Sequence, residues 1–208
     1  IFIFLEVEQM IWKKSYINMK YSRLEIKDVI LCEPKVNNDN RGFVYESYKK
    51  ETFDNFLGFE VNFCQDNVLY NNYGVIRGLH TNTPNFSQSK LISVLSGKIL
   101  DVAVDFRAGS PTFGKSIGVE LSSENKKQLF VPKGFLHGFS VLSEDAIVLI
   151  KIDRYFASGE SIGIKYDDEN LAIDWKIPKD LEILSEGDKR LSNFNSFSSP
   201  FNYNIKLY

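Results

Sequence analysis

The sequence has 208 residues, a length that fits one domain with a sizeable hydrophobic core. Its 25 basic and 27 acidic residues give a formal net charge of −2, which indicates neither a basic nucleic-acid surface nor an acidic disordered chain. Aromatic residues make up 14% of the chain, a share that suits a β-rich fold.

An apolar stretch opens the chain, and Glu6 and Glu8 interrupt it. It is too short and too charged for a spanning helix, and it lacks a small-residue cleavage site. Because Met19 begins a more regular sequence, we expect residues 1–18 to be a non-native or upstream extension, with an added edge strand or helix as the alternative. The chain then divides into a domain at residues 19–190 and a C-terminal tail at residues 191–208.

Alternating apolar residues, broken by Pro, Gly and Asn, predict many short strands. We expect them at residues 23–36, 43–48, 60–69, 91–95, 99–106, 115–121, 128–131, 135–142 and 146–152, with turns at 37–42 and 70–74. A helix is expected at residues 49–57, ending at Gly58, and a second one is left open at 178–190. Such a pattern predicts an antiparallel sandwich or barrel.

Two parts of this pattern are more specific. Within residues 99–106, Leu100 and Val102 share one face, and Asp101 and Ala103 share the other, as in a half-buried hairpin strand. The tail is rich in Ser, Asn and Phe and has no clear period, so it is either an extended arm or disordered. Its phenylalanines favour docking on the domain.

Polar side chains gather in the segment from Gly74 to Leu91, where Arg77, His80, Gln88 and Lys90 interrupt an apolar pattern. Buried charges must be paired or used, so we expect these groups to face a pocket. The two cations have no adjacent acid and suit an anion, either a phosphate or a developing oxyanion. Beside them a neutral histidine could act as a base once a carboxylate fixes its tautomer, although a histidine satisfied by backbone is the simpler alternative.

Several kinds of site are disfavoured. The chain has only two histidines, His80 and His137, so a three-histidine metal site is excluded and one of two histidines with a carboxylate remains open. Cys32 and Cys64 have no CxxC spacing, which indicates neither zinc nor a disulfide framework and favours a reduced, cytoplasmic setting. No Walker loop, dinucleotide-binding GxGxxG or GxSxG elbow is present. We therefore expect a site without metal, and ATP-driven, nicotinamide and triad hydrolase chemistry are disfavoured.

Longer motifs carry a family resemblance, and they follow one another in order from about residue 20 to residue 190. They are NRGFVYES (40–47), FCQDN (63–67), GVIRGLH (74–80), QSKL (88–91), SGKILDVAVDFRAGSPTFGK (96–115), LSSENKKQLFVPKGFLHGFSVLS (121–143), YDDENLAIDW (166–175) and ILSEGD (183–188). With these the chain resembles the dTDP-4-dehydrorhamnose 3,5-epimerases, which are metal-independent, cupin-like enzymes. The resemblance implies an all-β, antiparallel jelly-roll barrel with a few short peripheral helices, and a homodimer.

The resemblance also implies a reaction that needs no cofactor, and the residues that carry it out. A base removes the proton beside the C4 ketone of a nucleotide-linked 4-keto-6-deoxy sugar, and the enolate is reprotonated from the other face, in a pathway that supplies surface polysaccharide. His80 would be the base, Asp188 would orient it, and Lys90 would stabilise the enolate oxygen. The positions that match substrate-binding residues are Arg41, Glu46, Gln65, Asn67, Arg77, His137 and Phe156, with the arginines suited to the diphosphate.

The sequence departs from the family pattern at one catalytic position. The tyrosine that delivers a proton to the opposite face is Ile150 here, in VLIKIDRYF, and a second family tyrosine is Phe156. Three explanations follow. Water or another tyrosine (Tyr45, Tyr73 or Tyr155) donates the proton, the enzyme epimerises one centre only, most simply C3, or the substrate or activity has changed.

Two further hypotheses stay open on sequence alone. A sugar-nucleotide 3,4-ketoisomerase would explain Ile150 but not the LSEGD carboxylate, and a non-catalytic sugar-nucleotide binding protein has no need of a base and its carboxylate. Contact between Asp188 and His80, with Lys90 in the same cavity, would favour catalysis. A remote Asp188 would favour the binding protein.

Overall fold

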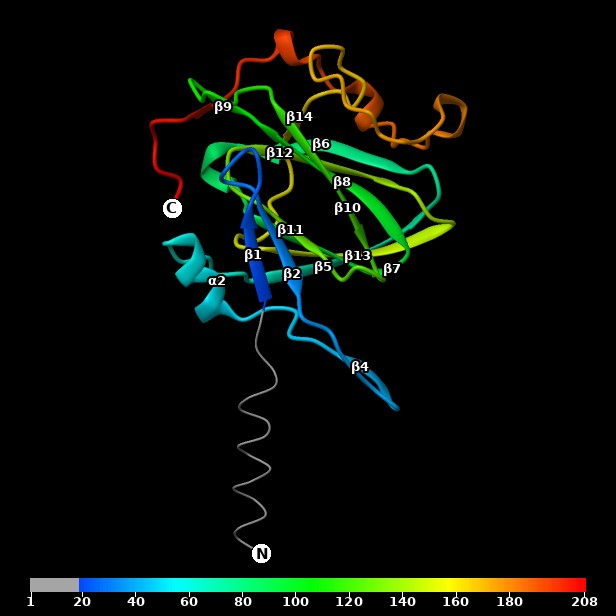
Figure 1. Ribbon diagram of the computed structural model, residues 1–208. Helices are drawn as coiled ribbons and strands as arrows, with labels where there is room; N and C mark the ends of the chain where they lie inside the picture. The colour runs from blue at the N-terminus through cyan, green and yellow to red at the C-terminus, as the bar shows by residue number, and fades with distance from the viewer. Residues whose placement is uncertain (1–18) are drawn as a thin grey trace, which may run out of the picture.

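Two antiparallel sheets make up the computed structural model, which describes residues 19–208 (Figure 1); the prediction for residues 1–18 lies outside this range. The larger sheet has the order β1 (Met19–Arg23), β2 (Ile30–Pro34), β11 (Gln128–Val131), β7 (Lys90–Ser96), β13 (Asp145–Ile152) and β5 (Gln65–Asn72). The smaller has the order β10 (Ser116–Ser122), β8 (Lys98–Asp105), β12 (Phe135–Val141), β6 (Ile76–Asn82) and β14 (Ser161–Gly163).

The sheets pack face to face around the main hydrophobic core. Ile92 of β7 and Val148 of β13 meet Ala103 of β8 and Phe139 of β12 in this cluster. Val102 instead belongs to a second cluster on the outer face of the smaller sheet, so the predicted alternation within residues 99–106 is confirmed. The all-β, antiparallel class is confirmed as well. Over residues 19–208 the strand pairing does not close the two sheets into a barrel, so the described fold is a sandwich.

Short elements flank the sandwich. They are the hairpin of β3 (Asn37–Asp39) and β4 (Gly42–Val44), helix α2 (Lys50–Leu57), the 3₁₀ turns η1 (Pro84–Phe86), η2 (Lys179–Leu181), η3 (Asp188–Arg190) and η4 (Phe194–Ser196), and the pair β9 (Arg107–Ala108) and β15 (Phe201–Asn202). The helix ends, as predicted, at Gly58, whose φ of 85° is a left-handed C-cap. Phe53 and Leu57 bury its apolar face in a third cluster with Phe130 of the larger sheet. No helix within residues 19–208 is long and apolar enough to cross a membrane.

Several local predictions were wrong. The strand predicted at residues 43–48 ends at Val44, and the one predicted at residues 60–69 begins only at Gln65. Residues 23–36 are not one strand, because Ile26 and Val29 turn into the core and separate β1 from β2. The expected turn at 70–74 is partly strand, since β5 continues to Asn72 in register with Asp145. Residues 178–190 form no α-helix; the segment is extended at Ile183, which exchanges backbone hydrogen bonds with residues 74 and 76.

The C-terminal tail docks on the domain, the outcome that its phenylalanines favoured. Phe194, Phe197, Phe201 and Leu207 pack into the cluster on the outer face of the smaller sheet. Figure 1 shows the same path, with the orange and red segments crossing above β6 and β14 and descending past β9. These apolar side chains therefore cover a sheet face that would otherwise be exposed.

Candidate active site

A cavity of about 260 Å³ is lined by titratable side chains, among them both histidines of the chain. Both sheets contribute to it, because β6 and β12 belong to the smaller sheet and β7 and β13 to the larger one. Its lining residues are Leu69, Arg77, His80, Lys90, His137, Phe139, Ile150, Ser185 and Asp188. The structure thus brings together five of the residues that the sequence analysis singled out: Arg77, His80, Lys90, His137 and Asp188.

The motif RGLH requires its glycine for the close approach of β6 and β12. Gly78 has a φ of 122°, and a Cβ placed on it would lie 2.7 Å from the Cα of Gly138. The two strands can therefore pair closely, with His80 directly opposite His137 in the register. Both histidines of the chain are brought to one wall of the cavity.

His80 contacts Asp188, which is 108 residues away along the chain. The Nε2 atom of His80 lies 2.5 Å from Oδ1 of Asp188. Burial would raise the pKa of Asp188, but the hydrogen bond and charge of His80 outweigh burial and lower it. The backbone N–H of Asp188 also donates to Oγ of Ser185 at 3.1 Å. An ionised carboxylate at Nε2 fixes that nitrogen as the donor and leaves Nδ1 available for proton transfer.

Lys90 is the first residue of β7 and is largely buried on the opposite wall. Burial lowers the pKa of its ammonium to about 8, although the charge of Asp101 acts in the other direction. Within the described residues the ammonium makes no hydrogen bond or ion pair. It is therefore a cation with unused donors, aimed into the same cavity as the histidine base.

A second histidine–carboxylate pair lies beside the first. Nε2 of His137 is 2.8 Å from Oδ1 of Asp101, and both side chains are buried. Burial lowers the pKa of His137, with Asp101 opposing the shift and Lys90 adding to it. Asp101 was not among the predicted site residues. The available signal was a carboxylate on the inward face of an apolar strand, and the Oδ2 atom of this carboxylate is buried without a partner in residues 19–208.

Other predicted residues lie at the edge of the cavity. Asn67 of β5 stands opposite Ile150 in the strand register, and Nε2 of Gln65 donates to its Oδ1 at 2.8 Å. Gln65 also accepts the backbone N–H of Phe156 at 3.1 Å, and Phe156 is 65% exposed. Asn67 and Gln65 share a strand face with Leu69, a lining residue, but neither they nor Phe156 line the cavity themselves.

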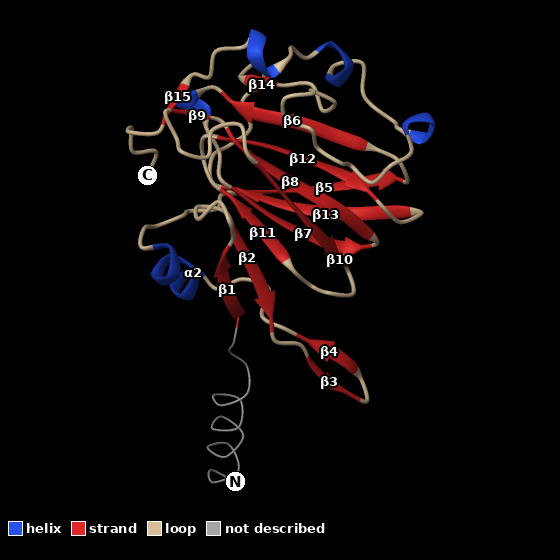
Figure 2. Ribbon diagram, turned by 45° about the horizontal axis from the view of Figure 1, so that its top comes forward, coloured by secondary structure: helices blue, strands red, loops and turns tan. Residues whose placement is uncertain are grey.

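Two further predicted binding residues, Arg41 and Glu46, also do not line this cavity. Arg41 lies on the β3–β4 hairpin, which projects away from the two sheets in Figure 2, and it pairs with Asp39. Glu46 follows this hairpin, and its Oε1 atom is buried without a hydrogen-bond partner in the described chain. Arg77 remains as the arginine of the cavity; its Nε donates to Oδ1 of Asn71 at 2.6 Å, and Asn71 is a contact that the sequence analysis missed.

Ile150 lines the cavity from the larger sheet, whereas His80 lines it from the smaller one. None of Tyr45, Tyr73 and Tyr155 is a lining residue of the described cavity. Over the same residues no cluster of three or more histidine, cysteine or carboxylate side chains is arranged to hold a metal ion. The arrangement offers an oriented base on one wall, and a cation for a developing oxyanion together with the apolar side chain of Ile150 on the other.

The chain matches one family of known proteins over most of its length. The family model for dTDP-4-dehydrorhamnose 3,5-epimerase matches residues 23–196. The dTDP-4-dehydrorhamnose 3,5-epimerase of Escherichia coli is 46% identical over 173 residues, which are 83% of this chain and 93% of that protein.

Solved structures agree. The crystal structure of a dTDP-6-deoxy-D-glucose-3,5-epimerase from Legionella pneumophila, in complex with dTDP-4-keto-L-rhamnose, matches with a TM-score of 0.86 and 40% identity, over 90% of this chain and 100% of that one. A 3'-monoepimerase from Streptomyces bikiniensis, in complex with dTDP-quinovose, matches at 28% identity and a TM-score of 0.77, over 82% of this chain and 85% of that one.

Proposed function

Because the chain belongs to the dTDP-4-dehydrorhamnose 3,5-epimerase family, we propose that it epimerises a dTDP-linked 4-keto-6-deoxy sugar. The C4 ketone acidifies the adjacent C–H bonds, so a positioned base is enough to begin the reaction without a cofactor. His80 takes the proton at Nδ1 and becomes an imidazolium beside the Asp188 carboxylate. Electrons from the broken C–H bond move to the C4 oxygen, where the Lys90 ammonium stabilises the enolate.

The observation that carries this proposal is the contact between His80 and Asp188 in the cavity that Lys90 also lines. A sugar-nucleotide binding protein has no use for a base with an ionised carboxylate behind it. The family assignment likewise removes the reason to consider a 3,4-ketoisomerase. Arg77, at the same cavity, is the proposed partner of the diphosphate, with Gln65, Asn67, His137 and Phe156 as further substrate contacts.

The new proton must reach the face of the sugar opposite His80, and the wall there holds Ile150. Isoleucine has no proton to donate, so we infer that water delivers it. A positioned acid contributes about 10²–10⁴-fold to a rate, and the second inversion is therefore slow. Epimerisation at C3 alone is the second candidate; Ile150 favours it, as does the similarity to a 3'-monoepimerase.

We propose a homodimer as the working form. The β3–β4 hairpin carries Phe43 and Val44, which are 57% and 44% exposed although apolar. On the edge strand β5, Val68 and Tyr70 are 64% and 62% exposed. A second copy of the chain would cover such surfaces and would give Arg41 a site to serve. Both cysteines are unpaired, which fits the cytoplasmic setting that we propose.

Turnover of a defined substrate tests the proposal. Purified protein is incubated with dTDP-4-keto-6-deoxyglucose, and the sugar stereochemistry of the product is read by proton NMR. The UDP- and GDP-linked sugars are the matched controls for the nucleotide. Inversion of the dTDP sugar at C3, with or without C5, supports the epimerase; unchanged substrate in all three cases overturns it.

A further inference from the structure

The last residues of the chain reach back to Ser89, which directly precedes strand β7 of the active site. The family model ends at residue 196, and the segment after it is fastened to the domain at several points. Phe201 is buried and pairs in parallel with Arg107, and the N–H of Tyr203 donates to the carbonyl of Ala108 at 3.0 Å. The final residue, Tyr208, lies at the end of this path.

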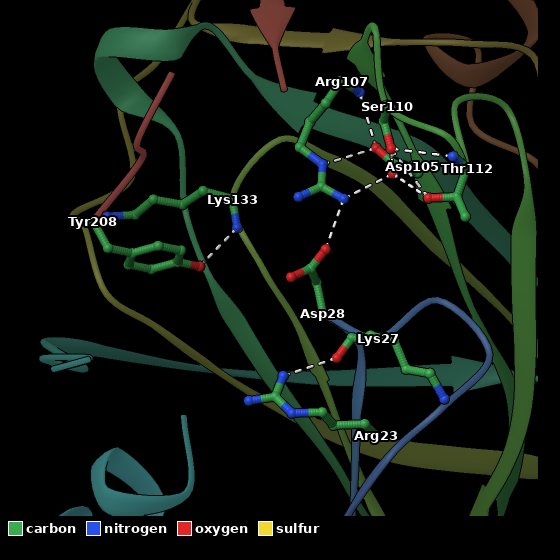
Figure 3. Close-up of polar contacts among 9 residues, drawn as sticks. All are labelled: Arg23, Lys27, Asp28, Asp105, Arg107, Ser110, Thr112, Lys133 and Tyr208. Carbon is green, nitrogen blue, oxygen red and sulfur yellow. Dashed lines mark hydrogen bonds and ion pairs between the residues drawn. The ribbon is translucent and has the colours of Figure 1, made fainter. Parts of the chain in front are cut away.

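Arg107 is the anchor that positions the tail. Its guanidinium lies between the rings of Phe135 and Tyr203, at 4.6 and 5.0 Å from their centroids. Figure 3 shows the same guanidinium held by two carboxylates: Asp105 at 2.7 Å and Asp28 at 2.8 Å. Because two carboxylates of the domain hold this guanidinium in place, its contact with Tyr203 also fixes the path of the tail.

Tyr208 ends in a closed ring of polar contacts. Its hydroxyl lies 2.6 Å from Oγ of Ser89. The same hydroxyl accepts the backbone N–H of Lys133 at 2.9 Å (Figure 3). Oδ1 of Asp153 accepts the N–H of Ser89 at 2.7 Å, and Oδ2 of Asp153 lies 3.1 Å from Nζ of Lys133. The ring therefore joins Tyr208, Ser89, Asp153 and Lys133, which come from four separate segments.

The aromatic ring of Tyr208 is held as firmly as its hydroxyl. The centroid of the Phe59 ring lies 4.1 Å from the centroid of the Tyr208 ring. Nζ of Lys133 lies over the Tyr208 ring, 4.9 Å from the same centroid. Although 43% of the residue is exposed, burial of the hydroxyl raises its pKa. The hydroxyl therefore stays protonated, and it shares its hydrogen bond with the Ser89 hydroxyl.

The three domain residues in the ring of polar contacts each adjoin a strand of the active site. Ser89 is fully buried and directly precedes Lys90. Lys133 precedes β12, which carries His137, and Asp153 follows β13, which carries Ile150. We propose that Tyr208 is a positioning residue of the epimerase, which holds the start of β7 so that the Lys90 ammonium stays aimed at the enolate oxygen.

The inference rests on the proposed function, because it assigns Lys90 a role in that reaction. The test is Tyr208→Phe in the full chain, with Tyr203→Phe as the matched control; the Tyr203 hydroxyl makes no hydrogen bond in the described structure. We expect kcat to fall about 10-fold in Tyr208→Phe, as for small misplacements of a catalytic group, with KM within about twofold and Tyr203→Phe unchanged. Ser89→Ala removes the same bond from the other side, so it should cause a similar loss, and the double variant should lose little more.

A second readout separates positioning from general stability. A loosened β7 admits water to Lys90, so the alkaline limb of the kcat profile should move upward by on the order of half a pH unit in Tyr208→Phe. Unchanged kcat and pH profile in Tyr208→Phe would overturn the inference, as would a lower melting temperature alone. Faster amide hydrogen exchange over residues 87–96, against Tyr203→Phe, tests the contact without substrate. Normal exchange there contradicts the proposed hold of Tyr208 on β7 even if the protein proves to be no epimerase.

Discussion

His80 and Ile150 line one cavity from opposite sheets. A base and an acid that act on opposite faces of a planar enolate need this relative placement, but here the second position is apolar. Replacing Ile150 by tyrosine should supply the missing proton donor. We expect Ile150→Tyr to raise the rate of the slower inversion by at least about 10-fold, within the range for a positioned acid.

Ile150→Phe is the matched control for that variant, since it adds the ring without the hydroxyl. The rates of inversion at C3 and C5 are followed separately by NMR. Equal rates in Ile150→Tyr and Ile150→Phe would show that the hydroxyl does not reach the enolate. They would contradict the placement of residue 150 on the wall that faces the enolate opposite His80.

Lys90 must be protonated to stabilise an enolate, and burial lowers its pKa to about 8. Activity should therefore fall as the pH rises through about 8, and Lys90→Met should abolish it at every pH. A profile that stays flat to pH 10 would remove Lys90 from the proposed role.

The same lowered pKa has a consequence for stability. Between about pH 8 and the unfolded value near 10.4 the unfolded state binds more protons, so wild-type stability rises with pH over that window. Below pH 8 the folded protein bears the full cost of the buried charge. Lys90→Met should thus raise the free energy of unfolding near pH 7 by up to about 3 kcal/mol, and the gain should shrink above pH 8. Chemical denaturation at pH 7 and pH 10 measures the difference.

Asp101 controls the charge of its neighbours from a fully buried position. Its carboxylate raises the pKa of Lys90 and of His137 against the effect of burial. Asp101→Asn should move the alkaline limb of activity below pH 8, because Lys90 loses the charge that keeps it protonated. Asp66→Asn, at the exposed ion pair with Lys151, is the control and should leave the limb in place.

Asp188→Asn tests the orienting carboxylate. Loss of the partner at Nε2 permits the wrong imidazole tautomer, so kcat should fall by about 10²–10⁴-fold with little change in KM. The pKa of Asp188 is lowered in the folded state, so its contribution to stability is present above the ordinary Asp value near 3.9 and is lost as the pH falls through the folded value. The stability gap between wild type and Asp188→Asn should therefore narrow below about pH 4. A constant gap from pH 7 to pH 3 would contradict the pairing.

Local patterns predicted much of the fold. The alternation in residues 99–106 and the helix ending at Gly58 depend on nearest neighbours, and both are present. Contacts between distant segments were not predictable in this way. The extended path at Ile183 exists because residues 74 and 76 supply its backbone partners.

The site shows the same limit. Polar residues within the apolar stretch from Gly74 to Leu91 indicated a pocket, and the resemblance supplied Asp188 from 108 residues away. Asp101 could not be predicted as a site residue, because the alternation in its strand is that of an ordinary half-buried strand. Tyr208 gave no signal at all, since only the folded tail brings it beside Ser89.

Deuterium exchange tests the central claim most directly. Wild type and His80→Asn are incubated in D₂O with dTDP-4-keto-6-deoxyglucose, and the C3 and C5 proton signals are followed by NMR. Removal of these protons by His80 predicts that wild type loses the C3 signal, and the C5 signal more slowly, with inversion, while His80→Asn retains both. Exchange in His80→Asn at the wild-type rate, or none in wild type, would contradict the account.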